Sequence, residues 1–170
     1  MSVGNRALIV IDIQNDYFPG GQFPLWNAED TLANVEQVIG RAREQGVHVI
    51  VIQHVAGGPA PFFNRGTPGV ELHPRICALA GDAPLVVKQF ADGFHQTNLE
   101  ETLARLEIEE LLVCGMMTQN CVTHTAISKA AEKYNVAILS DCCTTVSEIL
   151  HKIALNGLST RVSLLPGVSI

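Results

Sequence analysis

The chain's most constraining feature is a series of short runs that are apolar throughout, separated by longer amphipathic segments. The first run, residues 7–11, reads Ala-Leu-Ile-Val-Ile. Strands with one solvated face alternate apolar and polar residues, so continuous runs indicate strands covered on both faces. Such strands separated by helices form a parallel sheet between two helical layers. We predict a three-layer α/β/α fold with about six mostly parallel strands, at residues 7–11, 47–52, 84–87, 110–114, 136–140 and 162–165.

The segments between these strands carry helical periodicity and helix-end signals. Apolar side chains in residues 30–45 recur at helical spacing, and Gly46 follows as a stop signal. Residues 97–100 and 145–148 have the Thr-x-x-Glu spacing of a capping box. Predicted helices therefore span residues 30–45, 97–106, about 118–133 and 145–156. Residues 54–70 form one long stretch rich in Gly and Pro, and such loops in compact domains usually carry function.

Length and charge limit the classes of function. The 170 residues, 47% apolar and 16% charged, suit one globular domain over residues 1–170. A net charge of -6 and the absence of a Lys/Arg run argue against nucleic acid as a partner. The first apolar run is too short for a membrane span and lacks a cleavage signature, so we expect no membrane association and a cytoplasmic location. The expected partner is a small-molecule substrate.

The five cysteines do not read as a disulfide framework, because their number is odd and no Cys-x-x-Cys pair occurs. Cys114 lies inside an apolar run and Cys77 among apolar neighbours, so both are expected in the core. Cys142 and Cys143 are expected in a strand-end loop, where packing is their simplest role. The fifth cysteine, Cys121, follows a predicted strand and opens a predicted helix.

Three polar groups fall where ligands bind in open parallel sheets, beyond the carboxyl ends of the strands. Asp12 ends the first predicted strand, Lys88 the third, and Cys121 follows the fourth. A helix N-terminus and a nearby ammonium would both favour a thiolate at Cys121. Asp12 could then take the thiol proton and return it to a leaving amine. The spacing alone favours the simpler interpretation, a structural Asp–Lys ion pair beside a core cysteine.

Motifs in order along nearly the whole chain resemble the isochorismatase-like, or cysteine hydrolase, superfamily. The matching segments are Ala7-Leu8-Ile9-Val10-Ile11-Asp12-Ile13-Gln14-Asn15-Asp16-Tyr17-Phe18, Thr67-Pro68-Gly69, Leu72-His73-Pro74, Lys88 with Phe90, Phe94, Thr97 and Leu99, Gly115-Met116-Met117-Thr118-Gln119-Asn120-Cys121-Val122 with Thr125-Ala126, and Asp141-Cys142. The resemblance implies a Rossmann-like hydrolase fold and a catalytic triad of Asp12, Lys88 and Cys121. It also implies a cis peptide between Met116 and Met117, an oxyanion hole from the backbone N–H groups of Met117 and Cys121, and a homodimer or homotetramer.

The metal-binding branch of this superfamily is a poor match. Nicotinamidases bind a metal through an Asp-x-His motif after the second strand, together with further histidines. This chain has Gln53-His54-Val55 at that place, so the first ligand is absent. Since a stable site needs three or four converging ligands, we predict no metal and no other cofactor.

Together these features predict a cysteine-dependent hydrolase of a small amide, ureido or carbamoyl substrate that works through a thioester. Two alternatives remain: an isochorismatase-type vinyl ether hydrolase, and a non-catalytic binding protein on the same fold. Gln14, Phe18, Trp26 and Phe94 are the predicted substrate-binding wall, with core packing as their other interpretation.

Overall fold

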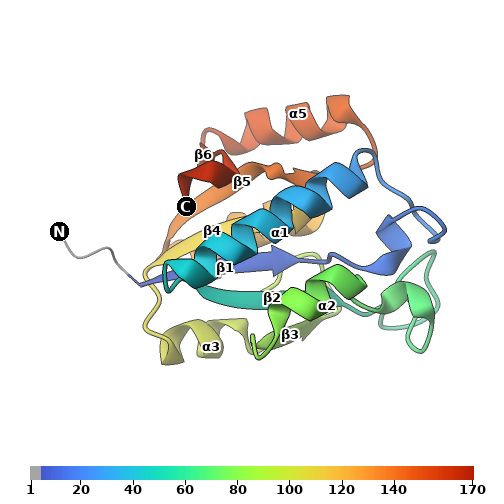
Figure 1. Ribbon diagram of the computed structural model, residues 1–170, viewed down its shortest axis with the longest axis horizontal. Coiled ribbons are helices and arrows are strands. Elements are labelled where there is room, and N and C mark those ends of the chain that lie inside the picture. Colours follow the sequence, from blue (N-terminus) through green and yellow to red (C-terminus); the bar gives the residue numbers. More distant parts are fainter. Residues whose placement is uncertain (1–4) are drawn as a thin grey trace.

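All six strands are parallel and follow the order β3-β2-β1-β4-β5-β6 in a single sheet, in a computed structural model that describes residues 5–170 (Figure 1). The predicted sheet is therefore confirmed. The strands are β1 (Arg6–Ile11), β2 (His48–His54), β3 (Leu85–Lys88), β4 (Glu110–Met116), β5 (Asn135–Thr144) and β6 (Ser163–Leu165).

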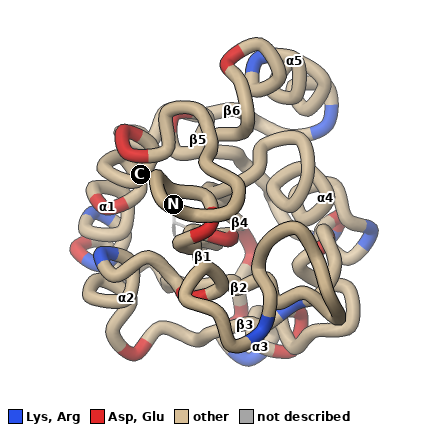
Figure 2. Tube along the Cα trace, turned by 90° about the vertical axis from the view of Figure 1, so that its right-hand side faces the viewer, with Lys and Arg blue, Asp and Glu red and all other residues tan. Residues whose placement is uncertain are grey.

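Helices cover both faces of the sheet, which completes the predicted three layers. They are α1 (Ala28–Glu44), α2 (Pro74–Ala80), α3 (Leu99–Arg105), α4 (Thr123–Ala126) and α5 (Glu148–Leu158). The side chains of β1 alternate between two cores: Leu8 and Val10 pack with α1 and α2, whereas Ile9 and Ile11 pack with α3 and α4. Figure 2 shows α1 and α2 on one side of the strands and α4 on the other. None of the helices in residues 5–170 has the length and apolar character to cross a membrane.

The strand order creates a crevice beside β1. The chain moves outward from β1 to β2 and β3, then crosses back to place β4 on the other side of β1. Ligands bind at such a switch point, beyond the carboxyl ends of the strands. Asp12 directly follows β1, and the turn that carries Cys121 follows β4. The topology thus brings two of the three predicted catalytic groups to one place.

The helix predicted over residues 118–133 is wrong. The segment instead forms a π-helical turn at Thr118–Val122, the four-residue α4 and a 3₁₀ turn at Lys129–Ala131. Hydroxyl side chains take over bonds that a regular helix would use. Thr123 donates to the Thr118 carbonyl at 2.6 Å, and Ser128 adopts an extended backbone while donating to Asp92 at 2.7 Å.

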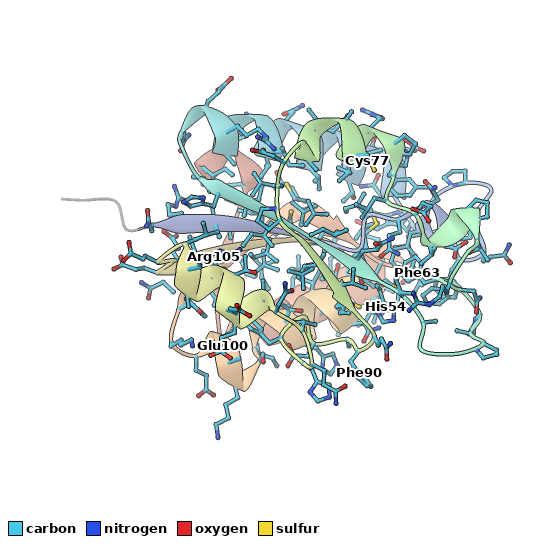
Figure 3. The ribbon with its side chains drawn as sticks, turned by 90° about the horizontal axis from the view of Figure 1, so that it is seen from below. His54, Phe63, Cys77, Phe90, Glu100 and Arg105 are labelled. Carbon is cyan, nitrogen blue, oxygen red and sulfur yellow. The ribbon has the colours of Figure 1, made fainter. Side chains whose placement is uncertain are left out.

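Four smaller differences from the predictions lie elsewhere in the chain. Helix α2 was not predicted; it begins at Pro74, and Nδ1 of His73 accepts the Arg75 N–H. Cys77 lies on its exposed side rather than in the core (Figure 3). Strand β5 extends to Thr144, so Cys142 and Cys143 are buried strand residues rather than loop residues. The helix α5 is capped by the Ser147 hydroxyl, not by Thr145.

Gly115 is required where β4 passes β1. Its φ is +125°, a conformation that L side chains rarely adopt, and an added Cβ would lie 2.1 Å from the Ile11 carbonyl oxygen. The approach occurs one residue before Asp12 on β1. The close packing of these strands therefore depends on glycine at this position.

Gly115→Ala should lower the free energy of unfolding by about 2–4 kcal/mol, because it combines a strained φ with a backbone clash. Gly40→Ala is the matched control: it lies in α1 with nothing within 4 Å of an added Cβ. That change should raise stability by about 0.5–1 kcal/mol, since alanine favours the helix. Urea unfolding followed by circular dichroism measures both, and equal stability of the two variants would contradict the packing argument.

Candidate active site

The carboxylate of Asp12 is held at the end of β1 by an abrupt change of backbone direction. Its φ is 53°, in the left-handed region, and its N–H donates to the Ile52 carbonyl at 3.1 Å. The side chain is fully buried. A non-glycine residue in this region is uncommon, and such residues concentrate at functional sites.

Lys88 contacts both of the other predicted catalytic residues. Its Nζ lies 3.0 Å from Oδ2 of Asp12 and 3.2 Å from Sγ of Cys121. The structure therefore brings the predicted triad together, with side-chain exposures of 2% or less. Burial alone lowers the pKa of Lys88, but Asp12 and Cys121 outweigh it and the pKa is raised. Lys88 is thus a charged ammonium beside an acidic partner.

The Asp12 carboxylate retains a free acceptor. Oδ2 lies 3.0 Å from Nζ of Lys88 as an ion pair, and neither carboxylate oxygen has a hydrogen-bond partner among residues 5–170. Leaving a buried carboxylate oxygen unpaired costs free energy. Such an atom is available to accept a proton from a neighbouring group.

Cys121 sits in the π-helical turn after β4, and this turn is anchored to Met117. The Met117 carbonyl accepts the N–H groups of Asn120 and Val122 at 3.0 and 3.3 Å. The peptide bond between Met116 and Met117 is cis. The two hydrogen bonds to the Met117 carbonyl hold the turn that carries Cys121 close to the backbone of Met117. The resemblance implies the oxyanion hole at this place.

The electrostatics of Cys121 differ from the predicted thiolate. Burial raises the pKa of its thiol, Asp12 raises it further, and Lys88 opposes both only in part. The four-residue α4 that follows is too short to supply the expected dipole. The resting site therefore holds a neutral thiol beside a charged Asp12–Lys88 pair, and attack requires transfer of the thiol proton.

His54 is a member of the site that the sequence did not reveal. Its Nδ1 lies 2.8 Å from Nζ of Lys88, and the two residues are direct partners in the β2–β3 register. Burial and Lys88 lower the pKa of His54, while Asp12 acts in the opposite direction. The available signal was that both residues end neighbouring parallel strands.

Two aromatic rings lie in series beside His54. The Phe63 ring lies 5.7 Å from the His54 ring, and the buried Tyr17 ring lies 4.6 Å from Phe63 (Figure 3). Burial raises the pKa of the Tyr17 hydroxyl, with Asp12 and Cys121 adding to the effect. Phe63 comes from the 54–70 loop, so this loop does reach the site.

The predicted substrate-binding wall is dispersed. Gln14 is fully buried and binds only backbone: its amide N–H group donates to the His54 and Val70 carbonyls and its oxygen accepts the His54 N–H. Phe18 packs on His73 and lines a separate cavity of about 750 Å³. Trp26 is partly exposed beside His151, and Phe94 stacks on Tyr134. We therefore reassign Gln14 as a brace for the backbone of His54.

The donor atoms at the site do not fit a metal ion. One ligand atom from each of Asp12, His54 and Cys121 lies within 4.8 Å of the others. However, Nζ of Lys88 contacts all three side chains at 2.8–3.2 Å. The ammonium therefore already supplies the positive charge that these groups face, and a metal ion bound among them would lie beside a like charge.

Comparisons with known proteins show which family the chain resembles over most of its length. The family model for the isochorismatase domain matches residues 6–165. The uncharacterized isochorismatase family protein YddQ of Bacillus subtilis is 38% identical over 149 residues, covering 86% of this chain and 82% of YddQ. The nicotinamidase of Escherichia coli is 28% identical over 179 aligned residues and covers 84% of each chain. The solved structure of an isochorismatase-like hydrolase from Alkaliphilus metalliredigens has a TM-score of 0.89 and 25% identity, over 97% of this chain and 96% of that one.

Lys88→Met should destabilise the fold by about 3–5 kcal/mol, because it leaves the Asp12 carboxylate buried without its cation. Adding Asp12→Asn to that variant removes the charge and should restore much of the loss. Urea unfolding of the single and double variants gives both values. If Asp12→Asn changes the free energy of unfolding by the same amount in the Lys88→Met variant as in the wild type, the two side chains are not coupled.

At pH 7, a limiting amount of iodoacetamide should modify the exposed Cys77 before Cys121, because Cys121 is a buried, neutral thiol. Peptide mass spectrometry gives the order of labelling. In the Cys77→Ser control, Cys121 should still react slowly with iodoacetamide, although Cys77 no longer competes for the reagent. Preferential labelling of Cys121 would instead mean that a thiolate already exists in the resting protein.

Proposed function

Since the chain belongs to the isochorismatase family, we propose that it is a cysteine-dependent hydrolase of a small amide, ureido or carbamoyl substrate. The observation that carries this proposal is the meeting of the Cys121 thiol, the Asp12 carboxylate and the Lys88 ammonium at a switch point of the sheet. A nucleophile beside a base that is itself oriented by a third group is the arrangement used in covalent catalysis.

The reaction begins with transfer of the Cys121 proton to Asp12 as sulfur attacks the substrate carbonyl. The tetrahedral oxyanion accepts hydrogen bonds from the Met117 and Cys121 N–H groups. Asp12 then gives the proton to the leaving amine, and a thioester remains on Cys121. Water attacks the thioester after losing its proton to Asp12, and that proton returns to sulfur as the acid leaves.

Acyl chemistry explains these side chains better than vinyl ether hydrolysis does. A thioester requires a sulfur nucleophile with a base beside it, and both are present at Cys121 and Asp12. Ether cleavage needs no such nucleophile. The similarity to a protein named a nicotinamidase supports hydrolysis of an amide in the same way. A binding protein without catalysis would have no use for a buried ion pair with an unpaired carboxylate oxygen.

Purified protein should release ammonia from at least one member of a panel of primary amides, ureido acids and carbamoyl compounds. Cys121→Ser should lower that turnover by at least about 10³-fold, because a hydroxyl is much harder to ionise. Cys77→Ser is the matched control and should leave turnover unchanged, and the wild-type rate should survive a metal chelator. Equal turnover by Cys121→Ser would rule out the thioester route. Failure to release ammonia from any compound of the panel would favour the binding-protein alternative.

A further inference from the structure

The Lys88 ammonium faces more acceptors than it has hydrogens. It carries three N–H bonds. Within 3.2 Å of Nζ lie four acceptor atoms: Nδ1 of His54, the Phe90 carbonyl oxygen, Oδ2 of Asp12 and Sγ of Cys121. Two of these, His54 and Phe90, take no part in the proposed chemistry. If each holds one N–H, a single N–H remains. It is directed at Sγ of Cys121, and Asp12 faces the ammonium at 3.0 Å without a hydrogen bond of its own.

The hydrogen bond between Lys88 and His54 fixes the state of the imidazole. An ammonium only donates, so Nδ1 of His54 must be an unprotonated acceptor and its proton must sit on Nε2. A protonated His54 would place two cations 2.8 Å apart. The charged groups that act on this ring are Lys88, which opposes protonation together with burial, and Asp12, which favours it.

The surrounding structure holds His54 in this orientation. Gln14 binds the backbone N–H and carbonyl of His54 at 2.9 and 2.8 Å. The Phe63 ring packs against the imidazole, and the Phe63 N–H is tied to Oδ2 of the buried Asp16 at 2.7 Å. Figure 3 shows His54 and Phe63 side by side at the end of β2. Because both the backbone and the imidazole of His54 are held in place, Nδ1 can remain directed at Nζ of Lys88.

We propose that His54 is a positioning residue, whose Nδ1 occupies one Lys88 N–H so that Asp12 is left without an N–H of its own. This role rests on the proposed cysteine hydrolase function. An ion pair without a hydrogen bond leaves Asp12 less stabilised as an anion, and therefore a stronger base, than if it had an N–H of its own. When the thiol proton moves from Cys121 to Asp12, the negative charge moves to sulfur. The remaining Lys88 N–H, which is already directed at sulfur, then stabilises that charge.

Two variants separate the acceptor from the shape of the side chain. His54→Asn keeps an acceptor at nearly the position of Nδ1, whereas His54→Leu has similar size and no acceptor. In His54→Leu the released N–H would be free to bond Asp12. His48→Leu is the control for the substitution itself, because His48 begins the same strand at the opposite end of the sheet.

In His54→Leu, kcat should fall at least tenfold with little change in KM, because Asp12 becomes a weaker base. The pH midpoint for the reaction of Cys121 with a small thiosulfonate, which forms a mixed disulfide and releases a sulfinate, should move downward by about one unit, because an N–H bonded to Asp12 weakens the repulsion between that carboxylate and a thiolate. His54→Asn and His48→Leu should match the wild type in both measurements. A purely structural role predicts no downward shift in that midpoint, and either its absence or an equal loss in His54→Asn would overturn the proposal.

Nitrogen NMR of the wild-type protein tests the same idea without substrate and without a variant that might misfold. At about pH 6.5, where an ordinary histidine is half protonated, the His54 ring should be mainly neutral with its proton on Nε2. A charged ring, or a proton on Nδ1, would refute the hydrogen bond on which the role depends. If no amide is hydrolysed but the NMR result and the shift in the thiosulfonate reaction are as expected, the proposed function fails while the arrangement of His54 stands.

Discussion

The buried ion pair between Asp12 and Lys88 is the interaction on which the site depends. It joins residues that follow β1 and end β3, so it spans β2 and requires all three strands to stop at the same level. The sheet register provides that alignment, since His54 at the end of β2 is paired directly with Lys88. An error of one residue in either pairing would turn these side chains to the opposite face. The ion pair is therefore as much a product of the fold as of the residue types.

The same pair changes how the nucleophile is activated. Asp12 and Lys88 largely cancel each other's charge, so a thiolate at Cys121 would be an additional buried anion. Burial then dominates, and the thiol is neutral at rest. Activation consists of moving a proton a short distance within the site rather than maintaining a charged sulfur. This keeps the number of buried charges constant while sulfur attacks, which avoids the free-energy penalty of creating a new unpaired ion.

The sequence alone could predict the layers and the six strands, because these depend on patterns within single segments. The resemblance to a family indicated the three residues that meet beyond the strand ends. Asp12 and Lys88 were recognisable as polar residues at the ends of apolar runs. The contribution of His54 was not, because it depends on which strands pair and in which register. The helix after Cys121 was predicted from apolar spacing, whereas Thr123 and Ser128 redirect the backbone through bonds that spacing does not encode. The predicted substrate-binding wall also depends on contacts between distant segments: Gln14 and Phe18 lie near Asp12 in sequence, but Gln14 bonds the Val70 carbonyl and Phe18 packs on His73.

Asp16 makes two segments of the chain inseparable. Its carboxylate is buried, and it accepts one N–H from Gln22 in the loop after β1 and one from Phe63 in the loop after β2. A cradle this close also requires glycine at position 69, where an added Cβ would meet the carboxylate at 2.0 Å. These loops are therefore not independent modules for recombination between relatives. A chimera that imports residues 54–70 alone would replace both the Phe63 N–H and the glycine at position 69 on which this carboxylate depends, whereas one that imports residues 15–22 with them would carry its own anchor.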